Sequence, residues 1–146
     1  MLAGETITME NVLDQTCITY PETYVREMSG NELKLILEDV ADNLFNPDPY
    51  YQQGGDMVRL GGLDYTLDPT AGAGKRISQM QLDNGKKIEA SKKYKVAGWA
   101  TVGSQSPGEP IWDVVATYLK DQKTVNFTKL NSPKLLNVKR NPGMIL

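Results

Sequence analysis

Ser29-Gly30-Asn31-Glu32-Leu33-Lys34-Leu35-Ile36-Leu37-Glu38-Asp39-Val40-Ala41-Asp42-Asn43-Leu44 is the stretch that decides the fold class, because it contains the clearest helix in the chain. Its first four residues have the composition of a helix start. Asn46 precedes Pro47, which disfavours helical backbone and predicts the end of the helix. Between these limits, apolar residues recur at spacings of three and four and form one stripe: Leu33, Ile36, Leu37, Val40, Ala41 and Leu44.

Helix and strand signals on either side of this stretch alternate irregularly. Thr8 and Glu10 predict a short helix over residues 9–16, and a strand over 18–28 is expected to be interrupted near Pro21. The order of elements predicts an α+β fold, in which helices cover a mixed or largely antiparallel sheet. Strands are predicted at 57–60 and 63–67, followed by a glycine-rich turn at 68–74, a weakly alternating segment at 76–82 and a hairpin turn at Asp83-Asn84-Gly85. A strand at 94–102 and a helix at 110–122 come next, and the helix has one apolar face: Ile111, Val114, Val115, Tyr118 and Leu119. The tail is expected to pack through Leu135, Leu136 and Val138.

Length and composition predict one compact domain, residues 1–146. The chain is 40% hydrophobic and 23% charged, as soluble globular proteins are, and no apolar run approaches the roughly 20 residues of a membrane span.

The chain has no histidine and one cysteine, Cys17, which is expected to be buried. Ser-His-Asp and Cys-His catalysis and a zinc site are therefore excluded. Residues 1–8 lack the features of a secretory signal, so any export signal was removed or belonged to a longer parent.

Charge is distributed unevenly along the chain. Residues 1–50 hold two basic and ten acidic side chains, a net −8, whereas residues 51–146 hold fourteen basic and eight acidic, a net +6. The lysines of 86–95 flank a turn and are expected on a solvated strand face, since a nucleic-acid site would show aromatic residues among them. The segment Gly72–Arg76 does not satisfy the phosphate-loop frame. Asp64, Asp68 and Asp83 are expected to cap turns.

The loop from Pro47 to Gly62 carries more chemistry than a connection needs. Four glycines allow positive φ and close approach, and the aromatic, amide and charged side chains are types that make oriented contacts. Two interpretations stay open: a ligand-facing loop, and a structural turn with its tyrosines packed under it. For Arg59, the ligand-facing interpretation is that its guanidinium pairs with an anion, and the structural interpretation is a surface ion pair with Asp56 or Glu22.

The chain carries a series of short motifs at residues 4–12, 28–33, 58–63, Asp68-Pro69, 74–77 and 93–96. In this order they resemble the C-terminal domain of the 5′-nucleotidase family. The resemblance covers residues 4–120 and implies that family's fold. Within the family, three segments look like the SoxB-type thiosulfohydrolases of bacterial sulfur oxidation: Asn46–Arg59, Val96–Ala100 and Glu109–Val114.

This resemblance implies a division of labour in a longer protein. An N-terminal metallophosphoesterase-like domain, absent from this sequence, would hold two manganese ions, and no cofactor is expected in this fragment. The whole protein would remove sulfate from an S-sulfonated cysteine on the C-terminal arm of the carrier SoxY (SoxYZ), and the resemblance implies a periplasmic location. The isolated chain would be inactive and would have no catalytic or metal-binding residue. Its substrate-binding residues would be Tyr50, Tyr51, Gln52, Gln53, Gly54, Gly55, Asp56, Arg59 and Trp99.

Two alternatives to this function are kept open. One is a module that docks the carrier without any catalysis, and the other is the nucleotide-binding domain of a 5′-nucleotidase-type hydrolase. Nucleotidases of the family clamp the base between two phenylalanines, whereas here Glu22 follows Pro21 and no Gly-Gly-Asp-Gly loop follows Trp99. Neither nucleic acid nor a membrane is an expected partner.

Overall fold

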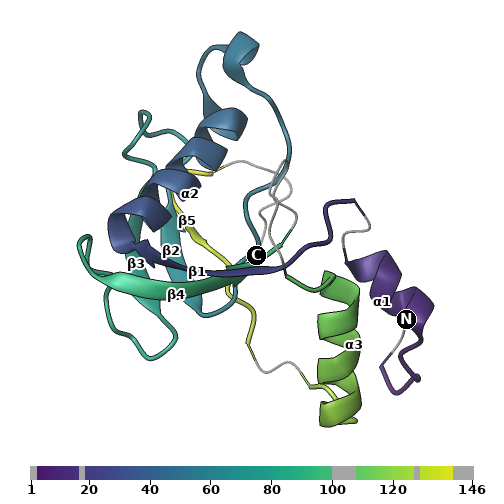
Figure 1. Ribbon diagram of the computed structural model, residues 1–146. Coiled ribbons are helices and arrows are strands. Elements are labelled where there is room, and N and C mark those ends of the chain that lie inside the picture. The colour runs from purple at the N-terminus through teal and green to yellow at the C-terminus, as the bar shows by residue number, and fades with distance from the viewer. Residues whose placement is uncertain (1–2, 17–18, 100–107, 127–128, 140–146) are drawn as a thin grey trace. The chain divides into compact units, whose positions relative to one another are not determined.

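A computed structural model describes residues 3–16, 19–99, 108–126 and 129–139. The chain divides into two compact units (Figure 1). The helical unit consists of residues 1–27 and 95–127, and the sheet unit consists of residues 28–94 and 128–146. Each unit is described by itself. No helix of the described ranges is both long and apolar enough to cross a membrane.

The helical unit contains α1 (Met9–Gln15) and α3 (Ile111–Gln122), which pack against each other. Thr8 caps α1 as predicted: its hydroxyl accepts the backbone N–H of Asn11 at 3.3 Å, and the Asn11 side chain accepts the backbone N–H of Thr8 at 3.0 Å. On α3 the predicted apolar face is only partly correct. Ile111 is buried and Val115 and Leu119 are half-buried, but Val114 and Tyr118 are exposed.

The strand before the decisive helix is shorter than predicted. Strand β1 spans Tyr24–Ser29 and pairs with β4 (Lys93–Gly98) in a two-stranded sheet. It begins after Pro21, which lacks the N–H that a strand ladder needs. Of the predictions for this region, Cys17, Ile18 and residues 100–102 lie outside the described residues.

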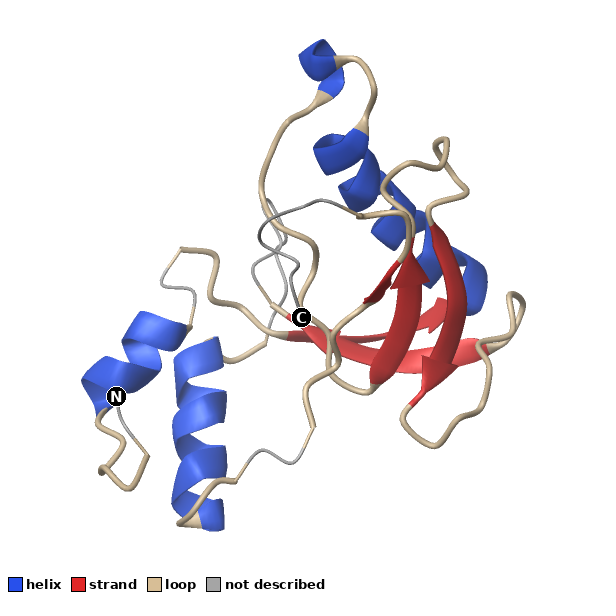
Figure 2. Ribbon diagram, turned by 180° about the vertical axis from the view of Figure 1, so that it is seen from behind, coloured by secondary structure: helices blue, strands red, loops and turns tan. Residues whose placement is uncertain are grey.

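The sheet unit is built on a three-stranded sheet of mixed direction (Figure 2). The central strand β2 (Leu63–Leu67) pairs antiparallel with β3 (Ile77–Leu82) and parallel with β5 (Lys134–Leu135). The predicted turn after β3 forms, since the N–H of Gly85 donates to the carbonyl of Leu82 at 2.8 Å and Gly85 has a φ of 78°. The α+β class with a mixed sheet is therefore confirmed.

The decisive helix, α2, spans Gly30–Phe45 and has Ser29 as N-cap and Asn46 as C-cap, as the sequence predicts. The stripe is narrower than predicted, because Ile36 is exposed. The predicted strand at 57–60 is wrong: this segment is a loop with one isolated bridge, from Leu60 to Asn131. Residues from α2, β2 and β3 form the buried core: Leu37, Ala41, Tyr65, Leu67, Ile77 and Met80.

The N-terminus of α2 is covered by the chain between β3 and β4. The backbone N–H groups of Gly30 and Asn31 donate to the carbonyls of Lys92 and Ala90 at 3.0 and 2.9 Å. A Cβ atom at Gly30 would collide with the carbonyl oxygen of Glu89 and the side chain of Ile88. Glycine is required here by close approach of another backbone, although the position is helical.

Candidate functional site

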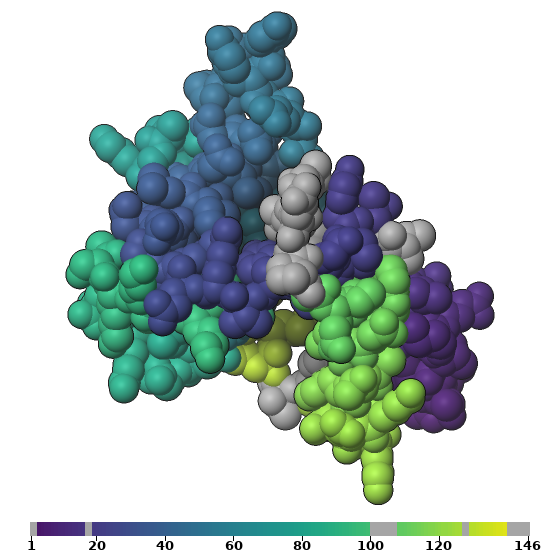
Figure 3. Space-filling model, in the orientation of Figure 1, coloured from purple at the N-terminus to yellow at the C-terminus, as the bar shows by residue number. Residues whose placement is uncertain are grey.

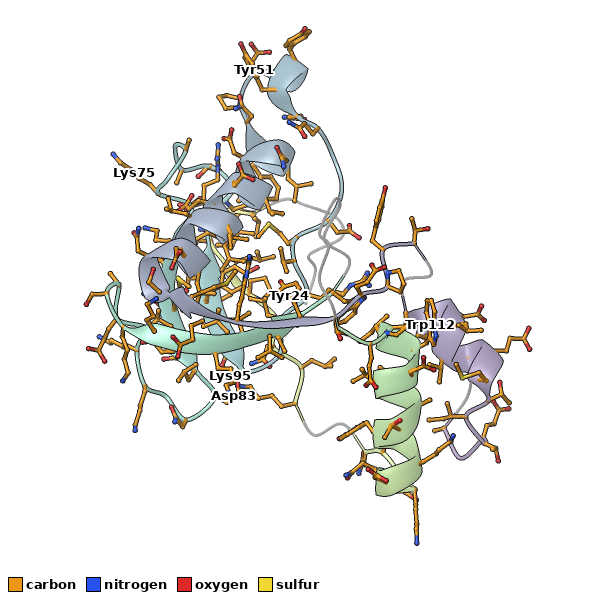
Figure 4. The ribbon with its side chains drawn as sticks, viewed as in Figure 1. Tyr24, Tyr51, Lys75, Asp83, Lys95 and Trp112 are labelled. Carbon is orange, nitrogen blue, oxygen red and sulfur yellow. The ribbon has the colours of Figure 1, made fainter. Side chains whose placement is uncertain are left out.

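An aromatic projection follows the C-terminal end of α2. Residues Pro49–Tyr51 form a single 3₁₀ turn, η1, which lies beyond the end of the helix (Figure 1). Tyr50 is 88% exposed and Tyr51 is 61% exposed, and their rings meet edge to face at 5.6 Å. The alternative in which these tyrosines pack under the loop is therefore wrong. We call residues 48–52 the tyrosine tip; it projects at the surface in Figure 3, and Figure 4 shows Tyr51 pointing outward.

The backbone of the tyrosine tip is held by its own hydrogen bonds. The Asp48 carboxylate accepts the backbone N–H of Tyr50 at 2.9 Å, and the Asp48 carbonyl accepts that of Tyr51 at 3.1 Å. The amide of Gln52 donates to the carbonyl of Asn46 at 2.7 Å. Gln52 therefore supports the loop from within, while the two tyrosine rings face solvent.

The chain returns from the tip through Gly54 and Gly55. Both have positive φ, 79° and 95°, which glycine adopts without strain. The N–H of Gly54 donates to the carbonyl of Asn43 at 3.1 Å, which ties this return to α2. Among the described residues, apart from the two chain neighbours of each glycine, no atom lies within 4 Å of where a Cβ would stand at either position. The loop therefore leaves open space beside its backbone.

Asp56 and Arg59 form the ion pair that the sequence left as one of two interpretations. Arg59 Nη2 lies 3.8 Å from Asp56 Oδ2, and the side chains are 94% and 84% exposed. An ion pair this exposed is screened by water and contributes little to stability. Both charges therefore remain accessible to a ligand, as does the exposed Gln53.

Trp99 belongs to the helical unit, whereas the other predicted site residues belong to the sheet unit. Its side chain is 46% exposed and follows Gly98, the last residue of β4. A Cβ at Gly98 would stand 2.5 Å from the hydroxyl oxygen of Tyr24, so the absence of a side chain there lets Tyr24 pack closely. The guanidinium of Arg26 lies 5.0 Å above the Tyr24 ring.

A buried arginine that sequence reasoning missed contacts the last turn of α2, from which the tyrosine tip extends. Arg76 is 1% exposed; its Nη1 donates to Asp42 Oδ1 at 2.7 Å and its Nη2 donates to the carbonyl of Phe45 at 3.1 Å. Hydrogen bonds from Arg76 and then from Asn46 lower the pKa of Asp42 below its ordinary value. Asp42, Phe45 and Arg76 also line an open cavity of about 420 Å³ against the turn at 69–73.

Glu38 is a second buried charge that the sequence analysis missed. Its two carboxylate oxygens accept the backbone N–H groups of Arg76 at 3.1 Å and Ile77 at 2.8 Å. Glu38 thus caps the beginning of β3 from α2. The available signal was the helical spacing of Glu38 and Asp42, four residues apart beside the apolar stripe.

A polar clip joins the C-terminal segment to the sheet. Lys129 Nζ lies 2.7 Å from Asp64 and 2.6 Å from Asp83, and the Asn131 amide donates to the same two carboxylates at 2.8 and 2.7 Å. Lys129, followed by Asn131, lowers the pKa of both aspartates. Asp64 and Asp83 were predicted to cap turns, but their carboxylates bind the C-terminal segment instead. The same prediction is correct for Asp68, whose carboxylate accepts the backbone N–H and the hydroxyl of Thr70.

Among the described residues, no group of three or more acidic, histidine or cysteine side chains could hold a metal ion.

Comparison with known proteins gives this geometry a family context. A model of the 5′-nucleotidase C-terminal domain matches residues 2–117. A comparison with curated protein sequences finds no match. Among solved structures, sulfate thiohydrolase SoxB from Thermus thermophilus is similar, with a TM-score of 0.81 and 34% identity over 97% of this chain and 27% of that chain.

Two nucleotidase structures share the fold at lower identity. A putative 5′-nucleotidase from Staphylococcus aureus has a TM-score of 0.65 and 18% identity over 88% of this chain and 30% of that one. A 5′-nucleotidase precursor from Thermus thermophilus has a TM-score of 0.66 and 19% identity over 90% and 28%. The chain therefore spans between a quarter and a third of the length of these proteins.

Proposed function

This chain belongs to the 5′-nucleotidase C-terminal domain family, and on that premise we propose that it is the substrate-binding and positioning domain of a SoxB-like sulfate thiohydrolase. The observation that carries the proposal is the tyrosine tip: two exposed rings on a hydrogen-bonded turn, in a chain 34% identical to SoxB. Exposed apolar surface on a fixed backbone is unfavourable in isolation and suits a site that binds a partner.

The chemistry of the tip fits an extended peptide that carries an anion. The rings of Tyr50 and Tyr51 offer flat amphipathic surfaces, and Gly54 and Gly55 leave room for a second backbone. The guanidinium of Arg59 forks onto oxyanions such as a sulfonate or a carboxylate. In this proposal the ligand is the C-terminal arm of the carrier SoxY (SoxYZ), and the helical unit contributes Trp99 as a separate contact with it.

The reaction itself belongs, in this proposal, to a preceding domain of the longer protein. Two manganese ions there would bind the sulfonate oxygens and supply a hydroxide, which is the chemistry that bound metal ions provide for hydrolysis. The residues of this chain bind and orient the arm. A periplasmic location follows from the same proposal.

Titration of the isolated chain with a peptide of the carrier arm, bearing an S-sulfonated cysteine, tests the binding role by NMR. We expect chemical-shift changes clustered on residues 50–59 and on Trp99. Tyr50→Ala combined with Tyr51→Ala should weaken binding at least tenfold, about 1.4 kcal/mol, whereas Tyr118→Ala, which removes an exposed tyrosine of α3, should leave it unchanged. No shift up to millimolar peptide would refute the proposal.

Two control ligands separate this function from the alternatives. AMP should cause no shifts; specific AMP binding with no peptide binding would favour the nucleotide-binding alternative. Manganese and the charged peptide added to the isolated chain should release no sulfate. Turnover by this chain alone would contradict its role as a positioning domain.

A further inference from the structure

We propose that Asn46 is a positioning residue, which transmits the fixed position of buried Arg76 through Asp42 to the exposed tyrosine tip. Only the binding consequence of this inference rests on the proposed function. The inference concerns residues 42–54 and 76, all of which lie in the sheet unit.

We call the series of hydrogen bonds that joins Arg76, Asp42, Asn46 and Asp48 the relay. Its first member, Arg76, is held in place because it is buried. Arg76 has 1% of its surface exposed, and a buried guanidinium is stable only where oxygen atoms accept its hydrogens. Asp42 and the carbonyl of Phe45 do so, at 2.7 and 3.1 Å. The Arg76 side chain thereby fixes both the last turn of α2 and the orientation of the Asp42 carboxylate.

Asn46 uses four polar groups, in two directions. Toward the helix, its backbone N–H donates to the carbonyl of Asp42 at 3.0 Å, and its Nδ2 donates to Asp42 Oδ2 at 2.8 Å. Toward the tip, its Oδ1 accepts the backbone N–H of Asp48 at 3.0 Å, and its carbonyl accepts from Gln52 at 2.7 Å. Only a side chain that both donates and accepts can make the two side-chain bonds, and asparagine has the right length.

The far end of the relay is Asp48, which starts the turn that carries the rings. Its carboxylate accepts from Tyr50 and its carbonyl accepts from Tyr51. Pro47 and Pro49 flank Asp48, and each proline restricts its own φ and the conformation of the residue before it. The turn therefore moves little on its own, and Asn46 sets its direction relative to α2.

This arrangement explains how two mostly exposed rings are held in one place. Their side chains are mostly exposed, so packing cannot position them. An ordered tip loses less conformational freedom on binding than a mobile one, and this pre-organisation strengthens affinity. Asn46→Ala cuts both side-chain bonds of the relay while leaving Arg76, Asp42 and both tyrosines in place.

The first test measures tip order in the free chain, without any ligand. Backbone ¹⁵N order parameters of Tyr50 and Tyr51 should fall from about 0.85 to below about 0.6 in Asn46→Ala. Those of Leu37 and Ile77 in the core should stay unchanged. Asn31→Ala, at the other end of α2, is the matched control and should leave the tip ordered. An unchanged tip in Asn46→Ala, or an equal loss of order in the core, would overturn the inference.

A second test uses a variant that removes one bond only. In Asn46→Asp the carboxylate can still accept from the Asp48 N–H, but it no longer donates to Asp42 and faces a like charge. We expect its order parameters at Tyr50 and Tyr51 to fall as in Asn46→Ala. Full order in Asn46→Asp would show that the Asp42 link, and hence the connection to Arg76, does not position the tip.

The binding consequence is measured separately, with the S-sulfonated carrier-arm peptide. Asn46→Ala should weaken binding about tenfold, although Asn46 itself need not touch the peptide. If the wild-type chain does not bind the peptide, the proposed function fails, while the order parameters still decide the relay. If the wild type binds and Asn46→Ala binds equally well with a disordered tip, the positioning role is refuted.

Discussion

Tyr65 and Arg76 each bury a polar atom that has no hydrogen-bond partner among the described residues: the Tyr65 hydroxyl and Arg76 Nε. The two cases differ in what surrounds the atom. Tyr65 lies in the apolar core, and burial raises the pKa of its hydroxyl. Arg76 satisfies its other nitrogens on Asp42 and Phe45. Removing the Tyr65 hydroxyl and removing the Arg76 guanidinium should therefore have different effects on the free energy of unfolding.

Tyr65→Phe should leave the free energy of unfolding unchanged or raise it by up to about 1 kcal/mol, because it removes an unpaired buried hydroxyl and preserves the ring. Urea denaturation measures this. Tyr65→Ala, which also removes the ring, should cost about 3–5 kcal/mol by leaving a cavity. A loss above about 1 kcal/mol in Tyr65→Phe would show that the hydroxyl has a partner.

Arg76→Met should lower the free energy of unfolding by about 3 kcal/mol, because it removes the charged centre on which the end of α2 is built. Arg76→Lys should not restore stability, since an ammonium cannot reach Asp42 and the Phe45 carbonyl with a planar fork. Lys75→Met changes the exposed neighbouring cation and is the control (Figure 4). Equal stability of the two methionine variants would contradict this role of Arg76.

At the scale of elements, local signals succeeded where their partners lie within a few residues. The caps of α1 and α2 and the turn at 83–85 are correct for this reason. Strand 63–67 is also correct, although its partner strands β3 and β5 are distant in the sequence. The segment 57–60 is apolar enough for a strand, yet within the described part of the chain no strand pairs with it beyond the bridge at Leu60. Strand formation depends on a partner, which local composition does not specify.

Gly30→Ala tests how strongly tertiary contact overrides helix propensity in α2. In an isolated helix this change would stabilise by about 1 kcal/mol. Here it should destabilise the protein by about 1–3 kcal/mol, because the new methyl group collides with the backbone at Glu89. Thermal unfolding gives the sign, and Asn31→Ala, one residue further along, should be neutral or stabilising. A stabilised Gly30→Ala protein would contradict the close approach.

At the scale of the whole molecule, the absence of histidine and the shifted carboxylates together determine the response to pH. The pKa values of Asp42, Asp64, Asp68 and Asp83 are lowered, so these groups stabilise the fold above the ordinary aspartate value of about 4 and lose that contribution as pH falls through their folded values. The pKa of Lys129 is raised, first by Asp64. Its contribution is complete below about 10.5 and is lost as pH rises through the folded value.

The melting temperature should therefore be constant between about pH 5 and 10 and fall on both sides of that range. Lys129→Met should lower the melting temperature within the plateau and flatten the alkaline fall, while Lys139→Met, on the same segment, should match the wild type. A transition between pH 6 and 7, where histidine titrates, would contradict this account.

Periodicity, caps and turn residues act over a few positions. They were therefore enough to predict the α+β class, the helix that begins after Ser29 and ends before Pro47, the hairpin turn and the unusual chemistry of the loop after Pro47. The folded chain was needed to show that Arg76 is buried, that Lys129 joins Asp64 to Asp83, and that Tyr50 and Tyr51 face solvent. The partners of these charges lie 34 to 65 residues away. In the sequence, a basic residue that will be exposed to water looks the same as one that will pair with a distant carboxylate. The folded structure is what distinguishes the two cases.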